Sequence, residues 1–235
     1  MVSRRYDPKM AKKTTGTKKA SPEDANPGGT RSAAPFVPRT VSLRTLSAAA
    51  HDCRGCDLYK TATQVVFGGG SRTARVMFVG EQPGDQEDRH GKPFVGPAGA
   101  VLQKALDAAG IPRDIAYLTN AVKHFKWEPR GKRRLHKKPL ASEIKACRPW
   151  LEAELRAIKP AVVVCLGATA AQAVLGPQFK LMQQRGRVLP SSLAGHVVAT
   201  IHPSAVLRAP DAEGRRAAYE MLVTDLKLVA EQVRR

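Results

Sequence analysis

The sequence of 235 residues has few cysteines, few acidic side chains and no long apolar run. Its 4 cysteines do not form a dense, evenly spaced framework, which excludes a small disulfide-stapled secreted module. No apolar run approaches the roughly 20 residues that a helix needs to cross a bilayer, and the Arg4-Arg5 pair precedes no apolar signal core. The sequence also contains no internal repeat. We therefore expect a soluble, cytoplasmic chain without membrane contact.

Basic residues outnumber acidic ones by 39 to 20, which gives a formal net charge of +19. Such an excess favours a polyanionic partner, and a nucleic acid is the leading candidate. Residues 1–40 carry a net +6 and offer little to bury, so we predict a disordered basic arm that either binds phosphates or only aids solubility. Residues 123–138 carry a net +7, which predicts a basic binding loop over about residues 126–138.

Apolar and helical segments alternate from Val41 to the C-terminus, and a hydrophobic content of 43% is enough for a core. The predicted strands are apolar on both faces, which is typical of a parallel sheet covered on each side. We therefore predict one α/β domain over residues 41–235, a three-layer α/β/α sandwich with a central, mainly parallel four-stranded sheet. The expected strands are 74–80, 115–122, 161–166 and 196–201, and the expected helices are 41–51, 97–109, 142–158, 168–175 and 213–233.

Polar residues and glycines follow several of the predicted strands. In sheets of this kind, ligands bind beyond the carboxyl ends of the strands. The pattern therefore predicts a ligand site beside the basic loop, although a set of ordinary solvated loops is an alternative. The residues that would form this site are Gly80, Glu81, Gln82, Phe94, Asn120, His202 and Ser204.

Five ordered motifs carry a family resemblance: GEQPGDQED, GKPFVGPAG, TNAVKH, ACRPWL and HPS. Through them the chain resembles the uracil-DNA glycosylase superfamily from Val41 onward, and within it the iron–sulfur, family 4-like branch. The stretch Lys132-Arg133-Arg134-Leu135-His136 is similar to the inserted loop of the X-type members, which become covalently attached to the DNA on which they act. Leu135 stands where an isoleucine is expected, and this exchange keeps an apolar side chain.

The resemblance implies excision of uracil from DNA, which requires the nucleotide to leave the base stack or to be single-stranded. Phe94 would stack on the base, Asn120 would read O4 and N3–H, and His202 would donate to O2 as negative charge develops there. Backbone groups of Gly80 and Gln82 would add contacts to uracil. The alternatives are a core phenylalanine, a strand-capping asparagine and a loop histidine.

His136 is the expected nucleophile of an X-type member. Its neutral imidazole would bond to C1′ of the sugar, and Glu81 would orient or deprotonate the ring. Two other readings stay open: a turnover glycosylase in which Glu81 or Gln82 positions water, and a uracil-DNA binding protein without chemistry. We expect a monomer that prefers single-stranded DNA. The residues expected to contact DNA are Lys132, Arg133, Arg134, Lys137 and Ser204.

The four cysteines suggest a single iron–sulfur cluster, because thiolates are its usual ligands. However, Cys165 lies inside an apolar run, where a small buried hydrophobic residue fits well. The resemblance to the iron–sulfur branch implies instead that His124 is the third ligand of a 4Fe–4S cluster. The implied ligands are Cys53, Cys56, His124 and Cys147. A four-cysteine site that uses Cys165, and zinc at the same ligands, are the alternatives.

Overall fold

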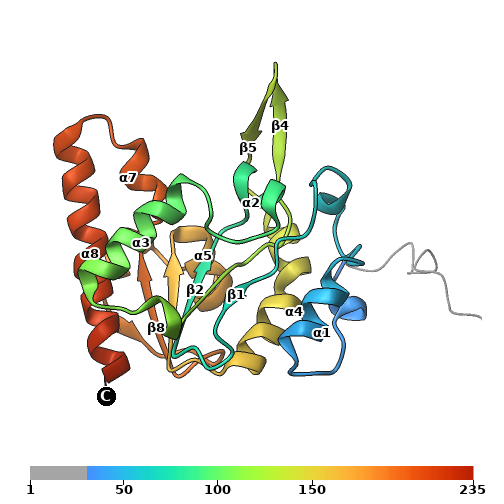
Figure 1. Cartoon of the computed structure of the whole chain (residues 1–235), viewed down its shortest axis with the longest axis horizontal. Coiled ribbons are helices and arrows are strands. Elements are labelled where there is room, and N and C mark those ends of the chain that lie inside the picture. Colours follow the sequence, from blue (N-terminus) through green and yellow to red (C-terminus); the bar gives the residue numbers. More distant parts are fainter. Residues whose placement is uncertain (1–30, 235) are drawn as a thin grey trace, which may run out of the picture. The chain divides into compact units, whose positions relative to one another are not determined.

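The computed structural model describes residues 31–234, and four parallel strands form the centre of its sheet (Figure 1). Two strands of two residues each extend this sheet at its edges in antiparallel orientation. The predicted fold class is confirmed, and the edge strands are additions that are too short for a sequence pattern. In order across the sheet, the strands are β1 (Gly69–Gly70), β3 (Ala116–Asn120), β2 (Val76–Gly80), β6 (Val162–Leu166), β8 (His196–Thr200) and β7 (Val188–Leu189).

Alternate side chains of the strands enter two separate cores. Val76 and Phe78 of β2 pack with α3 (Pro97–Ala109) and α8 (Ala212–Arg234). Met77 and Val79 pack on the opposite face with α4 (Ala141–Ile158) and α5 (Ala168–Leu175). These two helical layers produce the predicted three-layer arrangement (Figure 1).

Local signals set the ends of the helices. Ser42 caps α1 (Leu43–Ala50) by accepting a hydrogen bond from the backbone N–H of Thr45 at 3.3 Å. Helix α3 begins with a proline and ends at Gly110, whose φ of 71° is left-handed. The other helices are η2 (Ala34–Phe36), η3 (Asp57–Lys60), α2 (Asp85–His90), η4 (Arg113–Ile115), α6 (Leu181–Gln184) and α7 (Ser204–Arg208). In the described part of the chain, no helix combines the length and the apolar character that a membrane span requires.

The described chain begins at Arg31, before Thr40, which was the predicted end of the basic arm. Ala33 is buried, and its backbone N–H donates to the carbonyl of Ala146 in α4 at 2.7 Å. Phe36 and Val37 pack against the cluster formed by α1 and α4. These contacts attach residues 31–40 to the folded domain, whereas the predicted boundary lay after residue 40. Residues 1–30 of the predicted arm lie outside the described residues.

The predicted basic loop is a β-hairpin. Strand β4 (Trp127–Arg130) pairs with β5 (Arg133–His136), and Trp127 lies opposite His136. Gly131 in the two-residue turn has a φ of 58°, a left-handed conformation that glycine adopts without steric cost. The hairpin projects from the domain close to α2 (Figure 1). His136 therefore stands on a paired strand at the base of a defined element.

Candidate functional site

A cavity of about 820 Å³ opens at the carboxyl ends of the parallel strands. It brings together side chains from β3, α5, the hairpin and the loops after β2 and β8. Of the residues predicted from the strand ends, the following line it: Glu81, Gln82, Phe94, Asn120, His202 and Ser204. His136 lines the same cavity from the hairpin. The predicted convergence of strand ends and basic segment is therefore present.

Asn120 ends β3 opposite Gly80 at the end of β2, and it is only 3% exposed. A Cβ atom on Gly80 would lie 2.9 Å from Cζ of Phe94 and would also collide with the amide oxygen of Asn120. Glycine therefore allows these two side chains to approach the strand end. The hydrogen bonds of the described residues include none to the Asn120 side-chain amide, and no fully buried polar side-chain atom there lacks a partner. This amide therefore reaches the cavity, where its donor and acceptor are available to a ligand.

Phe94 is held in an unusual backbone conformation, with a φ of 56°. A Cβ on Gly99 would collide with the carbonyl of Phe94, so the α3 glycine makes room for this conformation. Glu87 accepts hydrogen bonds from the backbone N–H groups of Gly96 at 2.7 Å and Gly84 at 3.0 Å. These contacts fix the loop that presents the Phe94 ring, and this ring is roughly parallel to His202 at a centroid distance of 6.2 Å.

His202 is a neutral imidazole in this site. Its Nδ1 accepts a hydrogen bond from the backbone N–H of Ser204 at 3.1 Å and lies 2.7 Å from the Ser204 hydroxyl. Burial, aided by the positive charge of Arg208, lowers the pKa of His202 to about 4. Since Nδ1 accepts, the single ring proton is on Nε2. His202 can therefore donate a hydrogen bond to a ligand oxygen.

Glu81 connects the hairpin to the floor of the cavity. Its Oε1 lies 3.5 Å from Nε2 of His136, and its Oε2 accepts a hydrogen bond from the Thr169 hydroxyl. Partial burial lowers the pKa of His136, whereas the Glu81 carboxylate opposes this effect and Arg208 adds to it. The lowered pKa favours a neutral ring at pH 7, the form that has a free electron pair on nitrogen.

Gln82 anchors the base of the hairpin through its side chain. The Nε2 group donates to the carbonyls of Lys126 and Lys137 at 3.1 Å each, and Oε1 accepts from the Lys126 N–H at 3.1 Å. These three bonds engage the amide that was expected to position water. The side chain of Gln82 thus holds the base of the hairpin, and the residue still lines the cavity.

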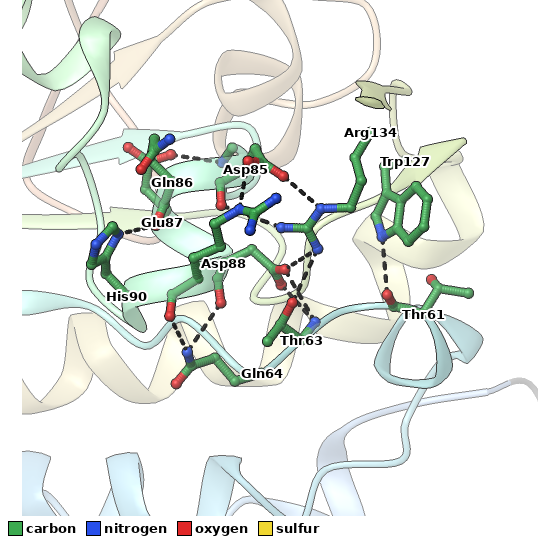
Figure 2. A network of polar contacts seen from close by, with 12 residues as sticks. Thr61, Thr63, Gln64, Asp85, Gln86, Glu87, Asp88, His90, Trp127 and Arg134 are labelled. Atoms are coloured by element: carbon green, nitrogen blue, oxygen red, sulfur yellow. Dashed lines mark hydrogen bonds and ion pairs between the residues drawn. The ribbon is translucent and has the colours of Figure 1, made fainter. Parts of the chain in front are cut away.

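Arg134 is turned toward the protein rather than toward solvent (Figure 2). Its guanidinium pairs with Asp85 at 2.5 Å and Asp88 at 2.6 Å, and it donates to the Thr63 hydroxyl at 3.0 Å. Trp127 supports the same attachment by donating from Nε1 to the Thr61 carbonyl at 2.9 Å. These contacts argue against the prediction that Arg134 contacts DNA, because two carboxylates already engage its donors.

The remaining basic residues of the hairpin are exposed. Lys132 and Arg133 are exposed at the hairpin turn, and Lys137 forms a solvent-exposed ion pair with Glu128 at 2.9 Å. Such exposed pairs contribute little to stability and can open. These side chains are accessible to phosphates, in contrast to Arg134.

The four implied cluster ligands line a second, smaller cavity beside α4, formed with the loops after α1 and β3, and Cys165 does not. Cys165 is fully buried in β6, in the apolar core beside α4 and α5. In the described residues, no group of three or more His, Cys, Asp and Glu side chains is arranged to hold a single metal ion. The ligands that share the smaller cavity are Cys53, Cys56, His124 and Cys147.

Hydrogen-bond donors surround the thiols of this cavity. Trp150 Nε1 donates to Sγ of Cys53 at 3.2 Å, and the Lys123 N–H donates to Sγ of Cys147 at 3.3 Å. Burial raises the pKa of Cys147 to about 12 and lowers that of His124 to about 4. His124 is therefore neutral and has an electron pair available for a metal, whereas Cys147 needs a compensating positive charge to become a thiolate.

Comparison with known proteins decides the family. The model of the uracil DNA glycosylase superfamily matches residues 67–227. The chain belongs to the uracil-DNA glycosylase superfamily. It is 38% identical over 186 residues to a type-4 uracil-DNA glycosylase of Archaeoglobus fulgidus, a match that covers 76% of this chain and 87% of that relative. It is 36% identical over 183 residues to a type-4 uracil-DNA glycosylase of Thermotoga maritima, covering 77% and 92% of the two chains.

This match confirms the predicted superfamily, and the matched region includes most of the site. The large cavity and its predicted residues lie within residues 67–227, whereas Cys53 and Cys56 precede this region. A type-4 uracil-DNA glycosylase of Pyrobaculum aerophilum is also similar, with 33% identity over 181 residues that cover 74% of this chain and 89% of the relative.

Thr169, Arg208 and Glu87 also line the cavity, and the sequence pattern did not indicate them as site residues. For Thr169 a signal was present, because it follows β6 by three residues, at the same carboxyl edge as the other site residues. Arg208 and Glu87 lie within helices, where polar residues are common and carry no comparable signal.

Proposed function

We propose that this chain removes uracil from DNA and then joins itself to the abasic sugar through His136. Its place in the superfamily and its type-4 relatives support uracil excision. The observation that supports the covalent step is the position of His136, with Nε2 3.5 Å from Glu81 Oε1 on a hairpin anchored by Gln82 and Arg134.

The base would enter between Phe94, Asn120 and His202. Phe94 offers its ring for stacking, and the unpaired Asn120 amide can donate to O4 and accept from N3–H of uracil. Cytosine carries an amino group in place of O4 and would leave the buried amide mispaired, at a cost of about 1–3 kcal/mol. The pocket therefore favours uracil.

Cleavage places negative charge on the leaving base, and a hydrogen bond from His202 would stabilise this charge. The neutral His202 donates from Nε2 to uracil O2, a hydrogen bond that strengthens as the C1′–N1 bond breaks. One nitrogen of the neutral His136 ring forms a bond to C1′ while the electron pair of C1′–N1 leaves with uracil, which takes up a proton from solvent. The proton on the other nitrogen of the alkylated ring passes to Glu81 and then to solvent. The N-linked imidazole is a poor leaving group, so the conjugate persists.

Lys132, Arg133 and Lys137 would hold phosphates beside the cavity, and Ser204 would contact the strand at its rim. We propose single-stranded DNA as the preferred substrate, since no base pair must then be opened. A monomer provides every residue of this site. Such an activity belongs in the cytoplasm of a bacterial cell, at the nucleoid.

We propose that Cys53, Cys56, His124 and Cys147 hold a 4Fe–4S cluster. The N–H donors to the Cys53 and Cys147 sulfurs fit bound thiolates, and the neutral His124 fits a nitrogen ligand. When bound, the cluster supplies a cross-link between the segments that carry these residues, since glycosidic cleavage needs no electron transfer.

A denaturing gel of uracil-containing single-stranded DNA tests this function. The wild-type chain should give a conjugate that resists heat and detergent, and His136→Ser should abolish it while free abasic strand appears. His196→Ser is a matched control, since His196 is exposed at the opposite end of β8, and it should behave like the wild type. Free abasic product from the wild type in repeated turnovers would instead indicate hydrolysis by water, and an unchanged strand would indicate binding without chemistry.

A further inference from the structure

Thr169 is a buried polar residue of the cavity to which the proposed reaction assigns no task. It is 5% exposed and lines the cavity from the first turn of α5. Its hydroxyl donates to Oε2 of Glu81, and the other oxygen of that carboxylate faces His136 at 3.5 Å. Thr169, Glu81 and His136 thus form a chain of hydroxyl, carboxylate and imidazole.

The backbone around Thr169 is itself fixed. Gly167 precedes α5 with a φ of 91°, and its N–H donates to the Thr200 carbonyl at 2.8 Å. A Cβ on Gly167 would lie 3.1 Å from Cβ of His202, so α5 starts close to the loop that carries this histidine. The position of the Thr169 hydroxyl is therefore set by the ends of β6 and β8.

We propose that Thr169 is a positioning residue that orients the Glu81 carboxylate toward His136. This inference rests on the proposed covalent function. The terminal torsion of a glutamate side chain is broad, so a carboxylate without a second partner samples many orientations. The hydroxyl on Oε2 restricts this torsion and directs Oε1 to the ring that must be held and later deprotonated.

Thr169→Val tests the proposal because it keeps the shape of the side chain and removes the donor, whereas Thr169→Ser keeps the donor. The assay measures, on uracil-containing single-stranded DNA, the rate of conjugate formation and the ratio of conjugate to free abasic strand. We expect Thr169→Val to lower both by about tenfold, equivalent to about 1.4 kcal/mol, while uracil release falls less. Thr169→Ser should restore the wild-type ratio.

A double-mutant cycle separates positioning from a general packing effect. In a Glu81→Ala background, Thr169→Val should change the ratio no further, because its effect passes through Glu81. Thermal unfolding of each variant verifies that it is folded. An unchanged ratio in Thr169→Val, or an equal loss with and without Glu81, would overturn the inference. A wild-type chain that releases uracil without any conjugate would instead refute the covalent function itself.

Discussion

Arg133 and Arg134 are adjacent basic residues for which the structure predicts opposite phenotypes. The guanidinium of Arg134 is directed at Asp85 and Asp88, and its side chain is 15% exposed. Arg133 is exposed beside the hairpin turn. Substitution of each by methionine keeps a long apolar stem and removes the charge, so the pair serves as a matched comparison.

The cost of Arg134→Met follows from Asp88, whose side chain is 0% exposed. Removing one partner of a buried ion pair costs about 3–5 kcal/mol. Asp88 keeps two hydrogen bonds from the Thr63 N–H, at 3.0 and 3.1 Å, so we expect the lower end, about 3 kcal/mol. With a urea m-value of about 2 kcal/mol per M, the unfolding midpoint should fall by about 1.5 M.

Arg133→Met should change the free energy of unfolding by no more than about 0.5 kcal/mol. If Arg133 contacts one phosphate, its loss should reduce the salt dependence of single-strand binding by about 0.7 in log–log slope. Urea unfolding and a binding titration at several salt concentrations measure both effects. A stable Arg134→Met chain whose only defect is a weaker salt dependence would refute the structural role of Arg134.

Three further predictions concern other parts of the protein. Gly80→Ala should abolish uracil excision in a folded chain, because the added methyl group displaces Asn120 and Phe94; normal excision would contradict this geometry. Partial burial lowers the pKa of His136, so conjugate formation should stay constant as the pH falls toward about 6.5 and decline only below it; a decline that begins well above pH 6.5 would exclude a neutral His136 nucleophile. Cys165→Ala should keep the brown colour of a cluster and Cys147→Ala should lose it, as absorbance spectra of the purified variants would show, and loss of colour in Cys165→Ala would contradict the His124 assignment.

The sheet and its helices could be predicted because buried positions require apolar residues, which recur along the sequence with the period of each element. Strand β6 is apolar at every position and is buried at every position, and α3 begins at a proline and ends before a glycine as its pattern indicates. The hairpin has no such periodic pattern, since most positions of β4 and β5 are exposed and three of their eight residues are arginines. Charge suggested a loop there, whereas pairing across Gly131 and the contacts of Gln82 make it an ordered element.

By itself the sequence determined the fold class, the carboxyl edge at which the site forms and the residue types present there. Those features depend on local periodicity and on the order of strands along the chain. Only the tertiary structure decided which of two neighbouring arginines faces solvent, because Arg134 meets Asp85 and Asp88 across a distance of more than 40 residues in the chain. The tertiary structure likewise brings the Thr169 hydroxyl to the Glu81 carboxylate. Contacts between the ends of different strands depend on packing that no local sequence pattern encodes.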